Sequence, residues 1–382
     1  HWIEAGPAAA QVPGARDTGH PLLGHRIAGP GDAARFVSEV SVDAQPFLRD
    51  HVVAGLTVFP GTAYLELAAA AMRAEQRSAA ILVEGFEIAQ PFILREGDRF
   101  LVHVTLTRDA TGTTASIASA LAETMQWRDH ATARVRIGGE ADANQAAPVA
   151  QVRAVGTTPV DVDAYYAACA SLGLAYGSAF RGLEALGFGP DGAWGTIAVP
   201  SEAADGSAWM LHPALLDACF HVLGAQLMNE AGALARRIYL PVGIDQVAVL
   251  GPVGRRVHCS ARIVPASSDA GIRQADLRLE DEHGRVVALI TGLRLRATDP
   301  DQARQLLQAE SIKPEGLTRS WDQLTDVRSP PRLAGHAVLI GSSGGVAGMV
   351  AIDWMTRGIG CDIVAPHEVA ELDRAGLAAR LA

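Results

Sequence analysis

A histidine stands where a base could work in the segment His51-Val-Val-Ala-Gly-Leu-Thr-Val-Phe-Pro. Gly55 and Pro60 follow His51, and Pro60-Gly61 suits the start of a helix. This spacing can bring the imidazole next to a helix N-terminus, where free N–H groups and the helix dipole favour negative charge. Removing a proton α to a thioester carbonyl needs such a combination. A lone histidine is more often structural, but the spacing to Gly55 and Pro60 favours catalysis.

An aspartate and a histidine lie four residues apart in His212-Pro-Ala-Leu-Leu-Asp-Ala-Cys-Phe-His. On a helix, Asp217 and His221 share one face and are close enough to hydrogen-bond. The neighbouring residues are apolar, so we expect a buried carboxyl with a raised pKa, because burial disfavours the charged form. A protonated Asp217 could donate to a leaving hydroxyl. The alternative is a surface aspartate paired with a cation, which fits the apolar neighbours less well.

A third motif, Tyr176-Gly-Ser-Ala-Phe, is typical of a turn. Gly177 would allow the chain to bend, and the rings of Tyr176 and Phe180 could line a cavity. Aromatic residues in a turn more often serve packing than substrate contact, so this motif alone assigns no role.

Two similar sets of elements must position these residues. Alternation of apolar and polar residues predicts half-buried strands at 35–42 and 100–107, and an Ala- and Leu-rich helix begins at Pro60 between them. The sequence then predicts helices at 160–169 and 212–227 and strands near 194–199, 247–250, 256–264, 274–280 and 286–295. Two consecutive sets of antiparallel strands, each with one long helix, indicate a duplicated α+β unit whose sheets join edge to edge.

Stretches rich in Ala, Gly and Pro divide the chain. We expect a linker at 1–17, a first unit at 18–140, a linker at 141–158, a second unit at 159–298, a connector at 299–331 and a fragment at 332–382. The fragment holds His336-Ala-Val-Leu-Ile-Gly-Ser-Ser-Gly-Gly, which is typical of the first strand and turn of a Rossmann-like βαβ unit. A complete dinucleotide-binding fold needs several such units, so a truncated neighbouring domain is favoured over a reductase.

Composition excludes several classes of protein. The formal net charge is −10, without a basic block, which disfavours nucleic acid and anionic membranes as partners. No stretch approaches the roughly 18 apolar residues of a membrane span, and no signal peptide is evident. The four cysteines form no CxxC pair, which argues against a disulfide framework and against a metal site. We therefore expect reduced thiols in a cytoplasmic protein.

Together, these motifs resemble those of the dehydratase domains of modular polyketide synthases and their fatty acid synthase relatives. The HxxxGxxxxP, DxxxQ/H and YGPxF motifs of that family are matched by His51, Gly55 and Pro60, by Asp217 and His221, and by Tyr176, Gly177 and Phe180. Further resemblances are Leu240-Pro-Val-Gly-Ile to the family's LPxxI stretch, His20-Pro-Leu-Leu-Gly to its start, and Trp127 with His130-Ala131 to its WxxHA segment. The resemblance runs from about residue 18 to 298, and the order and spacing of the motifs make it specific.

The resemblance implies a double hotdog, an α+β fold in which two antiparallel sheets each wrap around a long central helix. It also implies a hydro-lyase that dehydrates a β-hydroxyacyl thioester. His51 would take the α-proton, and Asp217 would protonate the departing β-hydroxyl. His221 would orient Asp217, and Tyr176 would shape or polarise the same tunnel. No metal and no organic cofactor are implied.

The family's partners are implied in the same way. The substrate would arrive on the phosphopantetheine arm of an acyl carrier protein of the same synthase, and the domain would form a homodimer between acyltransferase and ketoreductase domains. Residues 332–382 would then begin a ketoreductase structural subdomain. Acyl carrier proteins are acidic, so their docking site would be a local basic patch. Candidates are Arg26, Arg49, Arg181, Arg236 and Arg237.

Two positions depart from the family pattern. Ser178 replaces the proline of YGPxF, and Arg181 stands where Gln is common. Proline would stiffen the turn, so Ser178 leaves the loop conformation and the substrate preference open. One alternative is a dehydratase-cyclase, which also closes an oxygen heterocycle by oxa-Michael addition with the same acid–base pair. Another is a non-catalytic, structural dehydratase-like domain, which is disfavoured because His51 and Asp217 are both present.

Overall fold

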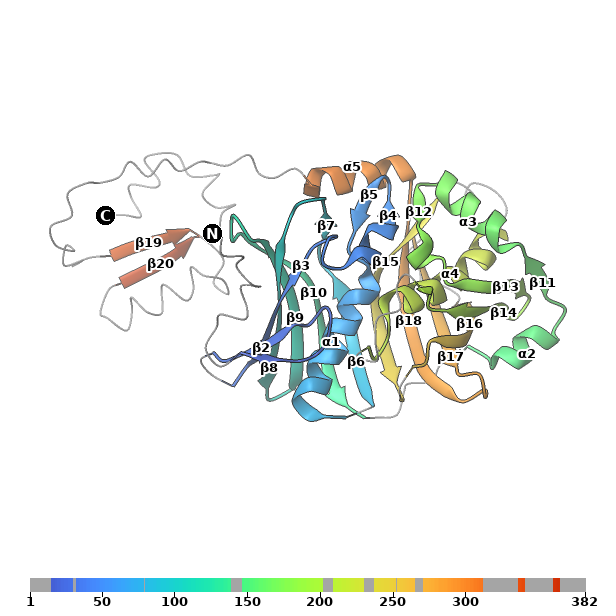
Figure 1. Ribbon diagram of the computed structural model, residues 1–382, viewed down its shortest axis with the longest axis horizontal. Coiled ribbons are helices and arrows are strands. Elements are labelled where there is room, and N and C mark those ends of the chain that lie inside the picture. Colours follow the sequence, from blue (N-terminus) through green and yellow to red (C-terminus); the bar gives the residue numbers. More distant parts are fainter. Residues whose placement is uncertain are drawn as a thin grey trace, which may run out of the picture. The chain divides into compact units, whose positions relative to one another are not determined.

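The computed structural model of the chain is shown in Figure 1. It describes residues 15–29, 32–78, 80–138, 146–201, 209–229, 237–251, 253–264, 271–311, 336–340 and 360–364. The chain forms two compact units, His1–Lys313 and Pro314–Ala382. All the candidate site residues belong to the first unit.

One antiparallel sheet of 14 strands forms the frame of the described part of the first unit. In spatial order the strands are β1 (Arg16–Asp17), β2 (His25–Ile27), β3 (Ala34–Val40), β8 (Phe100–Asp109), β9 (Gly112–Leu121), β10 (Trp127–Ile137), β6 (Ile81–Ile88), β15 (Ile238–Val249), β18 (Val286–Thr298), β17 (Ile272–Glu280), β16 (Arg256–Val264), β14 (Gly192–Ala198), β13 (Leu183–Gly189) and β11 (Thr158–Val160). The two halves meet where β6 pairs with β15, from Ile81 opposite Val249 to Glu87 opposite Gly243. The predicted edge-to-edge joining of two sheets is therefore confirmed.

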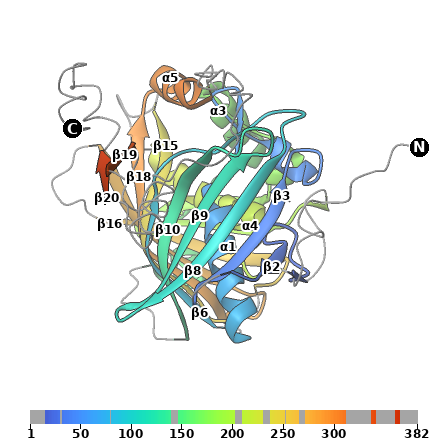
Figure 2. The same cartoon turned by 90° about the vertical axis from the view of Figure 1, so that its left-hand side faces the viewer.

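Each half of the sheet curves around one helix. Helix α1 (Gly61–Gln76) packs on β6, β8, β9 and β10, and helix α4 (Pro213–Asn229) packs on β13, β14 and β16. Figure 2 shows β8, β9 and β10 passing across α1. All the residues of α1 from Thr62 to Met72 are buried, because small alanine side chains let the surrounding elements approach closely. The helix start predicted at Pro60 is confirmed, since Pro60 is the N-cap residue.

The carboxylate of Glu66, on α1, ties the two halves together. The Glu66 side chain is fully buried, and its Oε1 accepts hydrogen bonds from Nε2 of His20 and from the backbone N–H of Met210, both at 2.8 Å. Its Oε2 accepts from the backbone N–H of Leu211 at 2.6 Å. Met210 and Leu211 lie just before α4, so a residue of the first helix fixes the start of the second.

The proton of His20 is fixed by the same network. Nδ1 of His20 accepts hydrogen bonds from the backbone N–H groups of Leu22 and Leu23, at 3.2 and 3.1 Å. The ring proton therefore sits on Nε2, where it is donated to Glu66. Close to this site the hydroxyl of Thr62 donates to the carbonyl of Pro213 at 3.0 Å, a direct hydrogen bond between α1 and α4.

A second, smaller sheet was not expected from the sequence. Its strand order is β12 (Leu174–Tyr176), β4 (His51–Val53), β5 (Leu56–Val58) and β7 (Ile93–Leu94). Ala54 and Gly55 connect β4 to β5 and have φ values of 52° and 83°. A two-residue hairpin of this kind needs positive φ at both central positions, which suits glycine. Gly55 therefore serves the turn that follows His51.

Two of the predicted linkers contain regular elements. Residues 141–158 include helix α2 (Val149–Ala154), which packs on Trp194. Residues 299–331 include helix α5 (Pro300–Ser311), whose Ala303 and Leu307 join a buried cluster of the first unit. The sequence analysis predicted neither of these helices. Short helices are stabilised mainly by packing on the rest of the fold, and their own sequences carry a weak signal.

The second unit has two described strands. β19 (His336–Ile340) and β20 (Gly360–Val364) pair in parallel. Parallel pairing of sequential strands is typical of a βαβ unit. The glycine-rich segment 341–348 lies outside the described residues, so the Rossmann-like fragment stays a prediction.

The thiols of Cys169, Cys219 and Cys259 are free and buried. Across the described residues, no group of three or more His, Cys, Asp or Glu side chains is arranged to hold a metal ion. No helix in that same part of the chain is long and apolar enough to cross a membrane.

His130, on β10, is a neutral histidine inside the fold. It is 2% exposed, its Nδ1 donates to the carbonyl of Gln90 at 3.2 Å, and its Nε2 accepts from the hydroxyl of Ser119 at 2.7 Å. Burial lowers the pKa of His130 from 6.5 to about 4. Protonation would place a charge in this buried position.

Replacing Glu66 by Gln should lower the free energy of unfolding by about 3 kcal/mol or more. An amide nitrogen would then face backbone N–H groups, and the charged acceptor of three hydrogen bonds would be lost. Denaturant unfolding of Glu66→Gln measures this loss. Glu75→Gln is the matched control on the same helix, because Glu75 pairs with Arg26 at the surface and such pairs contribute at most about 1 kcal/mol. Equal stability of the two variants would contradict the role of Glu66.

The stability of the domain should fall between pH 6.5 and about 4 because of His130. In this pH range His130 is protonated in the unfolded chain but stays neutral in the folded protein. The free energy of unfolding therefore decreases as the pH falls. At about 1.4 kcal/mol per pH unit, the full loss is about 3 kcal/mol. Denaturation at several pH values should show a flatter profile for His130→Gln. His283→Gln, at an exposed turn, should keep the wild-type profile.

Candidate active site

His51 is the first residue of β4, and its partner in the small sheet is Tyr176 on β12. The His51 side chain is buried, and its Nδ1 lies 2.7 Å from the carbonyl oxygen of Val58. A carbonyl oxygen only accepts hydrogen bonds, so Nδ1 carries a proton and Nε2 is the nitrogen that can act as a base. The β4–β5 hairpin therefore fixes both the position and the tautomer of His51.

Asp217 faces His51 from the other half of the molecule. It lies on α4, is 8% exposed, and its Oδ1 is 3.8 Å from Nε2 of His51. Its Oδ2 is 3.0 Å from Nε2 of His221, one turn further along α4. This second contact is within ion-pair distance, but its orientation does not form a hydrogen bond. The structure thus brings together His51, Asp217 and His221, residues that the sequence placed in two separate motifs.

The expected rise of the Asp217 pKa was wrong in direction. Burial is the largest influence and does raise the pKa, but attraction to the imidazoles of His221 and His51 outweighs it, and the pKa lies below 3.8. The expectation considered the apolar neighbours along α4 and not the two imidazoles that flank the carboxylate. The resting Asp217 side chain is therefore a carboxylate.

The Tyr176 motif packs around these three residues. The ring of Tyr176 lies 4.2 Å from that of His221, and the ring of Phe180 lies 5.0 Å from that of His51, as distances between ring centres. Burial raises the pKa of Tyr176 well above 10, so its hydroxyl stays neutral. Both predicted aromatic residues therefore contact the imidazoles directly.

Asp50, which the sequence analysis did not single out, holds the turn that contains Ser178. The backbone carbonyl of Asp50 accepts from the N–H of Gly177 at 2.8 Å. Its carboxylate accepts from the N–H of Ala179 at 2.7 Å and from the hydroxyl of Ser178 at 3.3 Å. A Cβ atom at Gly177 would lie 2.3 Å from Cγ of Asp50, so glycine is needed here. Ser178 therefore keeps the turn in place by a hydrogen bond, where proline would restrict it by its ring.

Two cavities adjoin the His51–Asp217 pair and share Pro241. The larger has a volume of about 350 Å³, and its wall includes His51 and Gly61, the first residue of α1. The smaller has a volume of about 110 Å³, and its wall includes Asp217. His51 therefore lines one cavity and Asp217 lines the other.

Several lining residues were missed by the sequence analysis. The larger cavity is also lined by Tyr64, Gln90, Arg296 and, from α5, Ala303, Leu306 and Leu307. The smaller cavity is also lined by Tyr165, Leu223, Gly224 and Leu227, beside the predicted His221 and Tyr176. Tyr64 stands in the same segment as Pro60, but its direction toward the cavity depends on the packing of α1.

Two family models match the chain. The model described as "Polyketide synthase dehydratase domain" covers residues 20–120, and that described as "Polyketide synthase dehydratase N-terminal domain" covers residues 144–305. The pikromycin polyketide synthase component PikAII of Streptomyces venezuelae is 34% identical over 261 residues, which are 60% of this chain and 7% of that protein. The chain belongs to the polyketide synthase dehydratase family.

Other relatives and solved structures agree with this assignment of a dehydratase domain. Polyketide synthase GfsB of Streptomyces halstedii is 30% identical over 321 residues, 79% of this chain and 6% of that protein. The structure of GphF dehydratase 1 superposes with a TM-score of 0.63 at 29% identity, covering 73% of this chain and all of that one. The dehydratase domain from the CurF module of curacin polyketide synthase has a TM-score of 0.65 at 28% identity, covering 73% and 99%.

The dehydratase domain spans only a small part of its multidomain relatives, 7% of PikAII and 6% of GfsB. Dehydratase domains of such synthases are hydro-lyases, and neighbouring synthase domains belong to the same architecture. These relatives therefore do not show which product the complete protein makes.

The candidate docking arginines of the dehydratase domain differ in their surroundings. Arg26 forms an ion pair with Glu75, Arg49 with Asp43, and Arg181 with Asp163. Arg237 is exposed and lines the smaller cavity. Arg236 lies outside the described residues. Of these arginines, Arg237 lines one of the two cavities beside His51 and Asp217.

Replacing Asp50 by Ala should lower the free energy of unfolding by about 1–3 kcal/mol, because the N–H of Ala179 loses its acceptor. Dehydration should slow as well, since Phe180 packs on His51 from this turn. Thermal unfolding and turnover measure both effects. Asp43→Ala is the matched control, since Asp43 forms only an exposed ion pair, and it should change stability by less than about 1 kcal/mol. An unaltered Asp50→Ala variant would exclude a role for Asp50 in holding the turn.

Proposed function

We propose that this domain dehydrates a β-hydroxyacyl thioester to the α,β-unsaturated thioester by acid–base catalysis during polyketide chain extension. The observation that carries the proposal is the 3.8 Å contact between Nε2 of His51 and Oδ1 of Asp217, both buried and placed between two cavities. The membership in the dehydratase family supports the same reaction class.

His51 is proposed as the base. Its Nε2 takes the proton from the α-carbon, which the thioester carbonyl already acidifies, so the chemistry requires no metal and no organic cofactor. The N-terminus of α1 at Gly61 lines the same cavity, and its N–H groups and dipole can stabilise the negative charge that develops on the carbonyl oxygen. Val58 supports this step by keeping the proton of the resting ring on Nδ1.

Asp217 is proposed as the acid, although its pKa is lowered. A neutral His51 with a protonated Asp217 holds as many protons as an imidazolium with a carboxylate, so the two forms interconvert by moving one proton within the pair. Substrate that fills the cavities and excludes water favours the neutral form, since charges are costly in a dry site. His221 and Tyr176 are proposed to orient Asp217 and to shape the tunnel around it.

The reaction balances on this pair. The electrons of the α C–H bond form the C=C bond, the β C–O bond breaks, and the proton of Asp217 converts the leaving hydroxyl into water. The pair ends as His51 imidazolium and Asp217 carboxylate, a state that the neighbouring His221 stabilises. Transfer of the proton from His51 back to Asp217 restores the neutral pair.

The positions of the two cavities also imply the orientation of the bound substrate. The α-carbon must lie at His51 and the β-carbon at Asp217, so the thioester lies in the larger cavity and the acyl chain beyond the β-carbon lies in the smaller one. The larger cavity suits the phosphopantetheine arm of an acyl carrier protein of the same synthase, and Arg296 at its wall offers a cation. We further propose a cytoplasmic double-hotdog homodimer that lies between acyltransferase and ketoreductase domains.

The proposal is tested with a synthetic β-hydroxyacyl pantetheine thioester that bears a distal hydroxyl. Wild type should release a product lighter by one water, and His51→Ala and Asp217→Asn should slow its formation by about 10² to 10⁴-fold, the usual contribution of a positioned acid or base. His283→Ala, at an exposed turn, is the control and should react like wild type. Mass spectrometry follows the product.

Chromatography against enoyl and cyclic standards separates simple dehydration from dehydration followed by oxa-Michael closure, since the two products have equal mass. A cyclic product would identify the dehydratase-cyclase. Absence of any product with wild type, across several chain lengths and both β-configurations, would overturn the proposal in favour of a structural dehydratase-like domain.

A further inference from the structure

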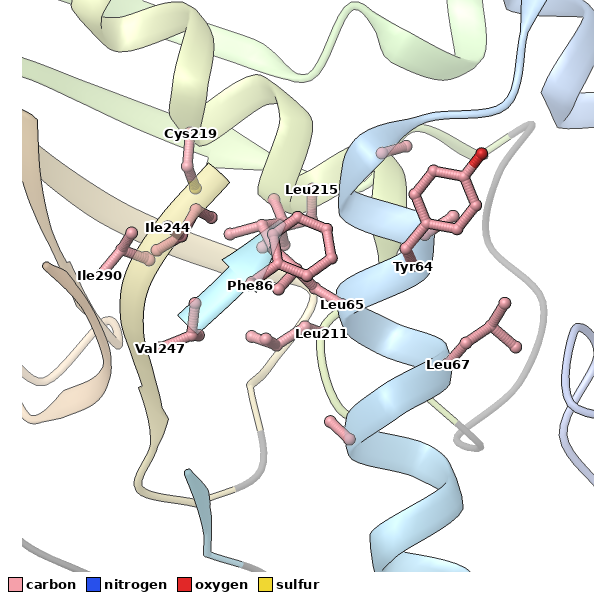
Figure 3. Close-up of a cluster of buried hydrophobic side chains, with 14 of the residues drawn as sticks. Tyr64, Leu65, Leu67, Phe86, Leu211, Leu215, Cys219, Ile244, Val247 and Ile290 are labelled. Carbon is pink, nitrogen blue, oxygen red and sulfur yellow. The ribbon is translucent and has the colours of Figure 1, made fainter. Parts of the chain in front are cut away.

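The Tyr64 hydroxyl forms no hydrogen bond within the described part of the protein. Tyr64 lies on α1 and is 1% exposed. Figure 3 shows its ring on a different side of the helix from Leu65, Phe86 and Leu211, which belong to the same buried cluster. The ring instead packs 5.0 Å from that of Phe59 and 6.0 Å from that of His130.

A buried hydroxyl without a partner destabilises a protein, because it loses its hydrogen bonds to water and gains none. Phenylalanine would fill the same space without this cost. Burial also raises the pKa of Tyr64 well above 10, so the group is a neutral phenol that can donate a proton in a hydrogen bond. Such a group is explained when a ligand supplies the missing acceptor.

Tyr64 faces the larger cavity, together with His51 and Gly61. It comes three residues after Gly61, about 4.5 Å along the helix axis. Side chains of a helix lean toward its N-terminus, which brings the Tyr64 ring back toward the helix start. The Tyr64 hydroxyl is therefore a donor near the helix start, at the cavity assigned to the thioester.

We propose that the Tyr64 hydroxyl donates a hydrogen bond to the amide carbonyl of the pantetheine arm nearest the sulfur. This inference rests on the proposed function, since it takes the thioester to lie in the larger cavity. The thioester oxygen has the N–H groups of the α1 N-terminus as donors. The next acceptor along the arm is this amide, two methylene groups beyond the sulfur. Tyr64 is thus a substrate-positioning residue that distinguishes an amide-bearing thiol from a simple alkyl thiol.

Two thioesters of the same β-hydroxyacyl group test the proposal. One is the N-acetylcysteamine thioester, which keeps this amide, and the other is the S-pentyl thioester, which has the same chain length without it. Tyr64→Phe should lower kcat/KM for the first about three- to tenfold, mainly through KM, as expected for one hydrogen bond. It should leave the second unchanged, and its Tm should equal or exceed that of wild type.

Tyr165→Phe is the matched contrast. The buried hydroxyl of Tyr165 already donates to the carbonyl of His221 at 2.9 Å, so its removal should lower the Tm and affect both thioesters alike. A fall in the Tm of Tyr64→Phe would show that the Tyr64 hydroxyl has an intramolecular role, which overturns the proposal.

The remaining outcomes separate this inference from the proposed function. If wild type converts both thioesters and Tyr64→Phe loses nothing, or loses equally on both, the amide contact is overturned and dehydration stands. An equal loss confined to kcat would place the hydroxyl on the thioester carbonyl instead. If wild type converts neither thioester under any condition, the proposed dehydration and the role of Tyr64 fail together.

Discussion

A base and an acid from different halves of a chain can act on one substrate only if the halves are held in a fixed relation. The buried carboxylate of Glu66 provides that constraint. It accepts hydrogen bonds from His20 at the start of the first half and from Met210 and Leu211 at the entry to α4. Continuous pairing of β6 with β15 adds a second tie. The distance between His51 and Asp217 follows from these contacts, which lie away from the reacting atoms.

The electrostatics of the site depend on this arrangement. Asp217 alone in an apolar helix would be a weak acid held neutral by burial, but His51 and His221 bring two imidazoles to it and lower its pKa. In the proposed reaction, one proton moves between His51 and Asp217. Substrate that excludes water from the cavities is proposed to favour the neutral form of this pair.

The cavities draw on segments far from the catalytic motifs. Helix α5 follows the last strand of the sheet, and its Ala303, Leu306 and Leu307 close part of the larger cavity. Asp50 fixes the turn that carries Ser178, so the departure from the family's proline leaves the local geometry supported by a hydrogen bond. Residues outside the predicted motifs thus line the larger cavity and support the turn beside the site.

The sequence by itself determined the family, the two central helices and the candidate acid and base. The motifs around His51 and Asp217 consist of residues that are close together in the sequence, so they can be recognised without a structure. The helix start at Pro60 follows from the backbone preferences of proline, which do not depend on tertiary contacts. The small sheet, the pKa of Asp217, the helix α5 and the orphan hydroxyl of Tyr64 were decided by tertiary structure. Each depends on contacts between residues distant in sequence, such as Tyr176 with His51, and a linear pattern carries no measure of those distances.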